Sequence, residues 1–290
     1  MLERFGRARS GSVVCPNCGR LVGVNDKECL NCGRKNPGLW GFAPALRRWG
    51  IDAAFDKIVI GVCVLLYLAS LAIDPGAIGF GSIFSMLSPG NFSLFLLGSS
   101  GAIPVFEFGR WWTVLSAGYL HGSLLHVLFN MMWLRQLGPA VAALYGTGRA
   151  MIIYTVASVC GFLLSSAAGH YLPFLPRFLH GAGFTVGASA AIFGLLGALV
   201  YYGKRAGSRG LGQQAWTWAA ALFVSGFILP GVDNWAHLGG YLGGWVMARW
   251  LDPLHPERGD HHLLAIACLL ATVAAVVASI ITGLPFRSPG

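Results

Sequence analysis

The sequence has 290 residues, of which 55% are hydrophobic and only 11% are charged, and its mean hydropathy is +0.64. A soluble domain carries about a quarter charged residues, so the composition excludes an ordinary soluble protein and indicates a polytopic α-helical membrane protein. The formal net charge of +9 is better explained by membrane orientation and contact with anionic lipid than by nucleic-acid binding, and no nucleic-acid partner is expected.

Residues 1–36 contain two CxxC pairs, Cys15 with Cys18 and Cys29 with Cys32, each followed by a glycine. Four cysteines at this spacing can supply four thiolates to one tetrahedral Zn²⁺, and the glycines let the backbone turn. The alternatives are two disulfides or a redox pair, which a reducing cytosol disfavours. The pattern resembles the short zinc ribbons of prokaryotic proteins. It predicts a structural zinc on which folding of the module depends, with a partner that the sequence does not identify.

After a linker over residues 37–55, we expect six transmembrane helices within 56–255, and a seventh helix with a tail within 256–290. Residues 74–118 are too broken by Gly and Pro to form a plain span, so they should lie in the interface or fold back on the bundle. Several apolar runs are long enough to cross about 30 Å of hydrocarbon. The predicted spans are roughly 56–73, 119–137, 149–169, 184–202, 214–230, 233–251 and 262–283.

The basic residues are distributed unevenly along the chain. Ten of the 20 lysines and arginines lie between Arg4 and Lys57, and seven more fall in the second, fourth and sixth connections. Only Arg110, Arg177 and Arg287 fall on the other side. By the positive-inside rule, we expect a multi-pass protein of the cell (plasma or inner) membrane with a cytoplasmic N-terminus and an external C-terminus.

Three polar residues share one predicted depth. His126, Ser189 and His237 each lie about five residues inside the second, fourth and sixth predicted spans, which is roughly 7 Å below their outer ends. A hydroxyl and an imidazole are costly at membrane depth unless they are paired or line a wet cavity. Ser189 and His237 can pair with each other, which is the arrangement that makes a serine nucleophilic.

Small residues predict close contact between the helices that carry this pair. Gly187 and Gly194 belong to a small-residue face of the fourth span, and Gly240 and Gly244 belong to a similar face of the sixth. Small-xxx-small patterns let membrane helices touch backbone to backbone. Such contact would bring the serine hydroxyl within hydrogen-bond reach of the histidine ring.

The sequence resembles the rhomboid family of intramembrane serine proteases over about residues 50–255. Three motifs in the family's order carry the resemblance: His121-Gly-Ser-Leu-Leu-His126-Val-Leu-Phe-Asn130, Gly187-Ala-Ser189, and Ala236-His237-Leu-Gly-Gly240-Tyr-Leu-Gly-Gly244. The resemblance implies a rhomboid-type six-helix core, to which the seventh helix and the zinc ribbon are additions. It also implies membrane-protein substrates, cut in or next to a transmembrane segment.

The resemblance implies a role for each motif residue. Ser189 would attack the scissile carbonyl with His237 as general base, and the chemistry would need no cofactor. His126, Asn130 and the Ser189 backbone N–H would stabilise the oxyanion. Phe193 would stack on the catalytic imidazole.

Four positions near these motifs need separate interpretation. Thr113 stands where rhomboids often carry an arginine after a tryptophan, which leaves the anchoring of that loop and the level of activity open, and Ala190 replaces the glycine that often follows the nucleophile. Asp233 lies one turn before His237, and we interpret it as an N-cap rather than a third catalytic residue. His121 is expected at the interface.

Two other functions were weighed against an active protease. A non-catalytic rhomboid-fold protein that binds membrane clients usually lacks the serine or the histidine; both are present here, and only Thr113 favours this alternative. A small transporter would need acidic residues inside its spans, and none lies well inside them. The sequence therefore predicts an intramembrane serine endopeptidase whose substrate it does not name.

Overall fold

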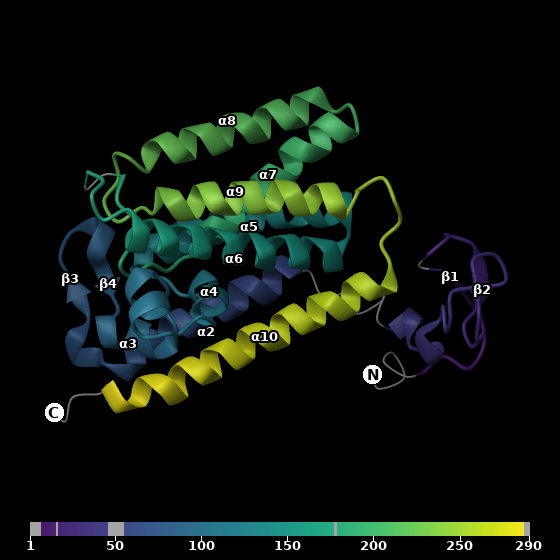
Figure 1. Ribbon diagram of the computed structural model, residues 1–290, viewed down its shortest axis with the longest axis horizontal. Coiled ribbons are helices and arrows are strands. Elements are labelled where there is room, and N and C mark those ends of the chain that lie inside the picture. The colour runs from purple at the N-terminus through teal and green to yellow at the C-terminus, as the bar shows by residue number, and fades with distance from the viewer. Residues whose placement is uncertain (1–6, 16, 46–54, 177–178, 287–290) are drawn as a thin grey trace.

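The computed structural model describes residues 7–15, 17–45, 55–176 and 179–286. Part of the predicted linker, residues 46–54, and the basic residues Arg4, Arg177 and Arg287 lie outside these ranges. The described chain contains seven long helices, which form one bundle (Figure 1): α2 (Phe55–Ile73), α5 (Leu124–Tyr145), α6 (Thr147–Tyr171), α7 (Ser189–Arg205), α8 (Arg209–Ser225), α9 (Asn234–Trp250) and α10 (Gly259–Gly283).

Each of these helices overlaps one of the seven predicted spans. α8 is displaced, since it runs over Arg209–Ser225 instead of 214–230, and two other helices begin later than predicted. α5 begins at Leu124 instead of residue 119, and α7 begins at Ser189 instead of residue 184. Gly187 has φ +136°, which no helix can include. The predicted position of Ser189 in its helix was therefore wrong: it is the first residue of α7 rather than about the fifth, and His126 is the third residue of α5.

Three of the described helices are long and apolar enough to cross a membrane by length and composition: α2, α6 and the helical stretch Gly259–Phe286. α7, α8 and α9 have 17 residues each. α5 is longer, at 22 residues, but it carries His126, Asn130 and Arg135, which lower its hydropathy. The described chain is therefore an all-α membrane bundle with a small β module, as predicted.

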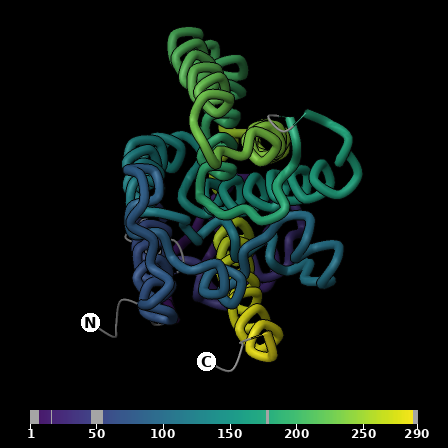
Figure 2. The backbone as a smooth tube through the Cα atoms, turned by 90° about the vertical axis from the view of Figure 1, so that its left-hand side faces the viewer, coloured from purple at the N-terminus to yellow at the C-terminus, as the bar shows by residue number. Residues whose placement is uncertain are grey.

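The centre of the bundle is formed by α6, α7 and α9, which pack on one another. The most apolar stretch of α6 is 67% buried, against 28% for α2 and 22% for α10, so the last two lie at the periphery. α8 contacts mainly α7 and stands apart at one edge of the bundle (Figure 2). The starts of α5, α7 and α9 all lie at the end of the bundle where α2, α6, α8 and α10 finish (Figure 1).

As predicted, the 74–118 segment does not span the bundle. It folds against the bundle in short elements. Strands β3 (Gly79–Phe80) and β4 (Met86–Ser88) pair antiparallel. They are followed by α3 (Asn91–Leu97), a π-helical turn (Ile103–Glu107) and α4 (Thr113–Ser116). α10 packs on both α3 and α4, so the seventh helix is part of the support of this segment.

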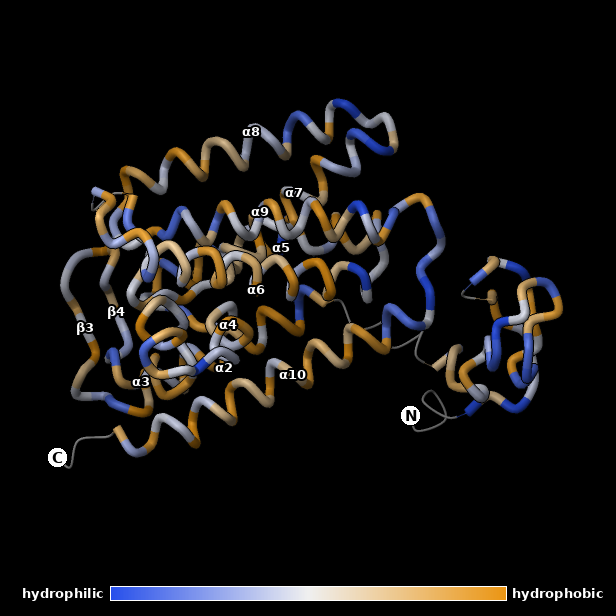
Figure 3. The backbone as a smooth tube through the Cα atoms, in the orientation of Figure 1, coloured by the Kyte–Doolittle hydropathy of each residue, from blue (hydrophilic) through white to orange (hydrophobic). Residues whose placement is uncertain are grey.

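The N-terminal module lies beyond the end of the bundle that is opposite the 74–118 segment (Figure 1). Its strands β1 (Ser12–Val14) and β2 (Leu21–Gly23) pair antiparallel, and Arg34 forms an ion pair with Asp260 at the start of α10. Hydrophilic residues are concentrated in this module and in the nearby connections between helices (Figure 3). The bundle therefore has one polar, basic end and one end that carries the 74–118 segment.

Candidate active site

Ser189 and His237 are brought into direct contact. The Oγ of Ser189 and the Nε2 of His237 lie 2.9 Å apart. Ser189 opens α7 and His237 is the fourth residue of α9, so the two side chains meet because their helices start side by side. Only 6% of His237 is exposed.

Phe193 lies flat against the His237 ring. The ring centroids are 4.1 Å apart and the planes differ by 14°. Residues four apart in a helix share a face, so Phe193 supports the imidazole from one turn below Ser189. The ring plane of the histidine is therefore set by the same helix that carries the hydroxyl.

The close approach of α7 and α9 depends on glycines in α9. A Cβ at Gly240 would overlap the main chain of Ala190, and one at Gly244 would overlap the main chain of Gly194. The backbones are thus in contact, as small residues permit in membrane helices. Ala190, which follows the serine, is fully buried in this contact.

His126 presents one ring nitrogen to the serine. Its Nδ1 accepts a hydrogen bond from the Gly122 N–H at 3.3 Å, so the neutral ring carries its proton on Nε2. A Cβ on Gly187 would lie 2.7 Å from this Nε2 and 3.7 Å from the Ser189 Oγ, which places the two groups on either side of Gly187. Because Gly187 has no side chain, the space between the His126 Nε2 and the Ser189 Oγ is open to a ligand atom.

Two further donors border the same space. One N–H of the Asn130 amide donates to the His126 carbonyl at 2.8 Å, and the amide group carries a second N–H. The first N–H groups of α7 have no intrahelical partner, and Ala188 offers them no side-chain cap. The positive end of the helix therefore lies at Ser189, where it favours negative charge.

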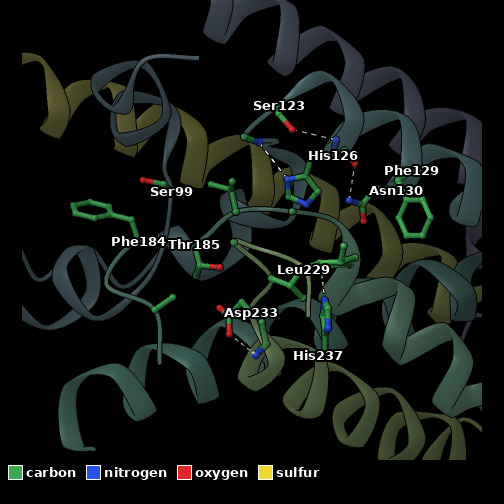
Figure 4. Close-up of a pocket in the computed structure, with 18 of the residues that line it drawn as sticks. Ser99, Ser123, His126, Phe129, Asn130, Phe184, Thr185, Leu229, Asp233 and His237 are labelled. Atoms are coloured by element: carbon green, nitrogen blue, oxygen red, sulfur yellow. Dashed lines mark hydrogen bonds between the residues drawn. The ribbon is translucent and has the colours of Figure 1, made fainter. Parts of the chain in front are cut away.

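A cavity of about 930 Å³ opens onto these groups (Figure 4). Its wall includes Ser189, His237, His126 and Asn130. The remaining wall comes from α3, from the ends of α5 and α8, and from the 182–187 and 229–233 loops. This volume is within the usual range for ligand-binding cavities, so the serine faces a space that can admit an extended chain.

Asp233 caps α9, as predicted. Its Oδ1 accepts the Ala236 N–H at 3.0 Å and its Oδ2 accepts the Ser165 hydroxyl at 2.5 Å. The Nδ1 of His237 has no hydrogen-bond partner among the residues that the structure describes. Asp233 therefore orients the start of α9 and does not contact the imidazole.

The structure corrects the expected position of His121 and resolves the loop anchoring that the sequence left open. His121 is not interfacial but fully buried, with its ring edge-on to His126 at 5.1 Å between centroids. Arg110, not position 113, anchors the loop: its guanidinium donates to the carbonyls of Phe95 and Ser279 at 2.9 and 2.7 Å. The only signal for this in the sequence was an arginine three residues from the expected position.

The four N-terminal cysteines form a cluster that can hold a metal ion. Their sulfur atoms all lie within 4.8 Å of one another, and the pairs Cys15–Cys32 and Cys18–Cys29 are 3.7 and 3.6 Å apart. Sulfurs around a tetrahedral Zn²⁺ with 2.3 Å bonds lie about 3.8 Å apart, so the donor set and spacing fit this ion. The backbone N–H of Arg20 lowers the pKa of the Cys18 thiol to about 6, whereas burial and the neighbouring Cys18 and Cys15 side chains raise the pKa of Cys29 to about 11.

The fold and the site define a polytopic membrane protein with a serine–histidine pair on the wall of a largely apolar cavity. Residues 108–252, half of the chain, match the family model of the Rhomboid domain. RHOMBOID-like protein 7 of Arabidopsis thaliana is 30% identical over 246 residues, which cover 80% of this chain and 73% of that protein. The chain belongs to the rhomboid family.

Two bacterial relatives are named as proteases. Rhomboid protease GluP of Bacillus subtilis is 33% identical over 166 residues, 56% of this chain and 30% of GluP. Rhomboid protease GlpG of Photorhabdus laumondii is 34% identical over 156 residues, 52% of this chain and 50% of GlpG. The chain thus spans half or less of these two proteins.

Proposed function

We propose that the protein is a serine endopeptidase that cleaves membrane proteins in or next to a transmembrane segment, using Ser189 and His237 as a catalytic dyad. The observation that carries this proposal is the 2.9 Å contact between the Ser189 Oγ and the His237 Nε2 on the wall of a large cavity. A nucleophile within hydrogen-bond reach of a base is the signature of covalent catalysis.

In the proposed reaction, His237 Nε2 takes the hydroxyl proton as the Ser189 Oγ attacks the scissile carbonyl carbon. The developing oxyanion lies between the His126 Nε2–H, the free N–H of Asn130 and the Ser189 backbone N–H. His237 then passes its proton to the leaving amine, which leaves an acyl-enzyme. Water from the cavity hydrolyses this ester with His237 again as base. Phe193 keeps the imidazole in plane throughout.

The N-terminal cluster is proposed to hold a structural Zn²⁺ through Cys15, Cys18, Cys29 and Cys32. When bound, the ion would cross-link a module whose buried core is limited to a few side chains, and metal binding supplies the folding energy of such modules. The cluster lies at the opposite end of the bundle from Ser189 (Figure 1), and we assign it no part in catalysis. We propose residues 1–36 as this module and 56–255 as the six-helix core that carries the reacting groups, followed by the seventh helix with the tail.

We further propose an orientation in the cell membrane. The end of the bundle that carries the cavity faces the outside, and the N-terminal module faces the cytoplasm, because the basic connections between helices lie at the end of the bundle next to this module. Phe174, in the connection between α6 and α7, is 76% exposed. Phe174→Cys should therefore react with a membrane-impermeant maleimide on intact cells. Lys204→Cys, at the end of α7, should react only after the cells are opened. The reverse pattern would contradict this orientation.

The proposed dyad is tested by labelling the purified protein with a fluorophosphonate probe, which reacts with activated serines. We expect the wild type to be labelled, and Ser189→Ala and His237→Ala to remain unlabelled. Ser189→Ala should keep the fold, because one hydroxyl contributes little packing. A folded wild type that is not labelled would contradict the proposal and favour a non-catalytic protein that binds membrane clients.

A further inference from the structure

Arg110 forms a buried tie between the 74–118 segment and the seventh helix. Only 2% of the residue is exposed. One guanidinium nitrogen donates to the Phe95 carbonyl in α3 and another to the Ser279 carbonyl in α10, and the guanidinium carbon lies 4.0 Å from the centroid of the Phe95 ring. The two terminal nitrogens are satisfied in this way, while the Nε has no partner among the described residues. Burying a cation is costly unless its donors are satisfied, so the two carbonyl acceptors hold the arginine where it is.

Other contacts join the same parts of the chain. The indole N–H of Trp112 donates to the Ser279 hydroxyl at 3.1 Å. The ring of Phe286, just after α10, packs edge-on against Phe95 and Phe108 with centroids 5.6 and 5.2 Å apart. The C-terminal end of α10 is therefore packed against the 74–118 segment through several specific contacts.

The 74–118 segment in turn holds the loop that leads into Ser189. Ser100 and Thr185 exchange two backbone hydrogen bonds, of 3.1 and 2.8 Å. The Ala102 N–H donates to the Ala182 carbonyl at 2.9 Å, and the Gly187 N–H donates to the Ala117 carbonyl at 3.0 Å. The 182–187 loop is thus paired along its length with the segment that Arg110 anchors.

We propose that Arg110 is a positioning residue for the reaction, and that α10 belongs to the catalytic unit through it. By joining Ser279 to Phe95, Arg110 keeps the 74–118 segment in register with the 182–187 loop, and so keeps Gly187 and the first turn of α7 in place beside His126. The inference rests on the proposed function for its catalytic consequence. It extends beyond the matched Rhomboid domain, residues 108–252, because α3 and α10 lie outside that match.

Arg149 provides a matched control for the test. It is also 2% exposed, and its guanidinium donates to the carbonyls of Leu251, Asp252 and His255 at 2.7 to 2.8 Å. It ties the connection between α9 and α10 to the start of α6, at the end of the bundle away from the cavity. Arg149→Met and Arg110→Met therefore remove the same kind of tie at opposite ends of the protein.

The full-length variants would be compared by thermal unfolding and by the rate of fluorophosphonate labelling per folded molecule. Both substitutions should lower the unfolding temperature. Only Arg110→Met should slow labelling, by about tenfold or more, because small displacements of reacting groups cost rate steeply. Arg110→Lys keeps the charge and one donor direction, and should recover part of the rate. Equal labelling rates for Arg110→Met and Arg149→Met would overturn the proposal.

Hydrogen exchange measures the positioning without relying on catalysis. The backbone N–H groups of residues 182–187 should exchange faster in Arg110→Met than in the wild type, and should not change in Arg149→Met. If Arg110→Met does not fold, Trp112→Phe, which removes only the indole donor, should give a smaller change in the same direction. Faster exchange with an unlabelled wild type would support the tie and contradict the proposed function. If the wild type is labelled but exchange is unchanged in the variants, the positioning role of Arg110 is contradicted and the proposed function is not.

Discussion

At the scale of single residues, the site is built by groups that restrict one another. The Gly122 N–H at Nδ1 of His126 leaves the Nε2 proton directed at the space beside Ser189, and Phe193 sets the plane of the His237 ring. These contacts are made before any substrate binds. In the proposed reaction the donors would therefore need little rearrangement, which is the main source of transition-state stabilisation by an oxyanion hole.

Asn130→Ala tests the oxyanion assignment. The substitution removes an amide that already donates to the His126 carbonyl and should lower kcat by about 10²- to 10³-fold, the usual effect of losing one oxyanion donor. KM should change little, because the donor acts on charge that develops only in the transition state. The measurement is steady-state cleavage of a transmembrane model substrate in detergent. A proportional rise in KM with unchanged kcat would instead assign Asn130 to substrate binding.

Substitutions of Asp233 distinguish a helix-capping role from a role in a catalytic triad. Asp233→Asn keeps an acceptor for the Ala236 N–H and should retain cleavage within a few-fold, because the carboxylate does not contact His237. Asp233→Ala should lower the free energy of unfolding by about 0.5–2 kcal/mol through loss of the cap. A loss of about 10⁴-fold in kcat for Asp233→Asn, as when the aspartate of a true triad is replaced, would show that the carboxylate acts on the imidazole.

At the scale of elements, the distance between α7 and α9 decides whether the dyad forms. Gly244→Ala places a methyl group into the main chain of Gly194 and should lower the free energy of unfolding by about 1–3 kcal/mol, as overpacking does. It should also slow labelling of Ser189, because α9 must move away. The measurements are unfolding in detergent and the labelling rate.

Gly61→Ala in α2 is the matched control, since a Cβ there meets nothing within 4 Å. It should be neutral or should stabilise the helix by up to about 1 kcal/mol, with normal labelling. Equal stability for the two variants would mean that α7 and α9 can separate at little cost.

At the scale of the whole molecule, the cysteine module and the cavity lie at opposite ends of the bundle. The module contacts the rest of the chain through Arg34 and Asp260, whose side chains are 24% and 35% exposed. Ion pairs at partly exposed positions contribute about 0–1 kcal/mol. The bundle should therefore fold and react without the module.

Replacing Cys15 and Cys18 by serine should abolish zinc binding and unfold the module, while cleavage in detergent persists near the wild-type rate. Zinc content by elemental analysis and cleavage of a model substrate are the two measurements. Cys268→Ser, which changes a cysteine in α10 outside the cluster, should retain both zinc and cleavage. Loss of all cleavage in the Cys15/Cys18 variant alone would make the module part of the catalytic unit.

The helices and the motif residues could be predicted from the sequence because both are local. The span of an apolar helix follows from its own length and composition, and each of the seven predicted spans overlaps a long helix. Predicting that Ser189 pairs with His237 required one further step. Successive spans alternate in direction, so the fourth and sixth spans run the same way and both residues lie near the same end of the bundle. The helix starts were less accurate, because Gly187 with its positive φ and the extended residues Leu120 and Ser123 interrupt the helix without changing the hydropathy.

The sequence by itself determined the membrane class, the cysteine cluster and the site residues near the starts of α5, α7 and α9. Each of these features depends only on neighbours within one segment of the chain. Only the tertiary structure decided how the 74–118 segment is held, because Arg110 finds its acceptor in Ser279, 169 residues away. His121, which is fully buried, was misplaced because burial depends on tertiary packing rather than on residue type. A buried polar side chain takes whichever partner the fold brings to it, and no local pattern specifies that partner.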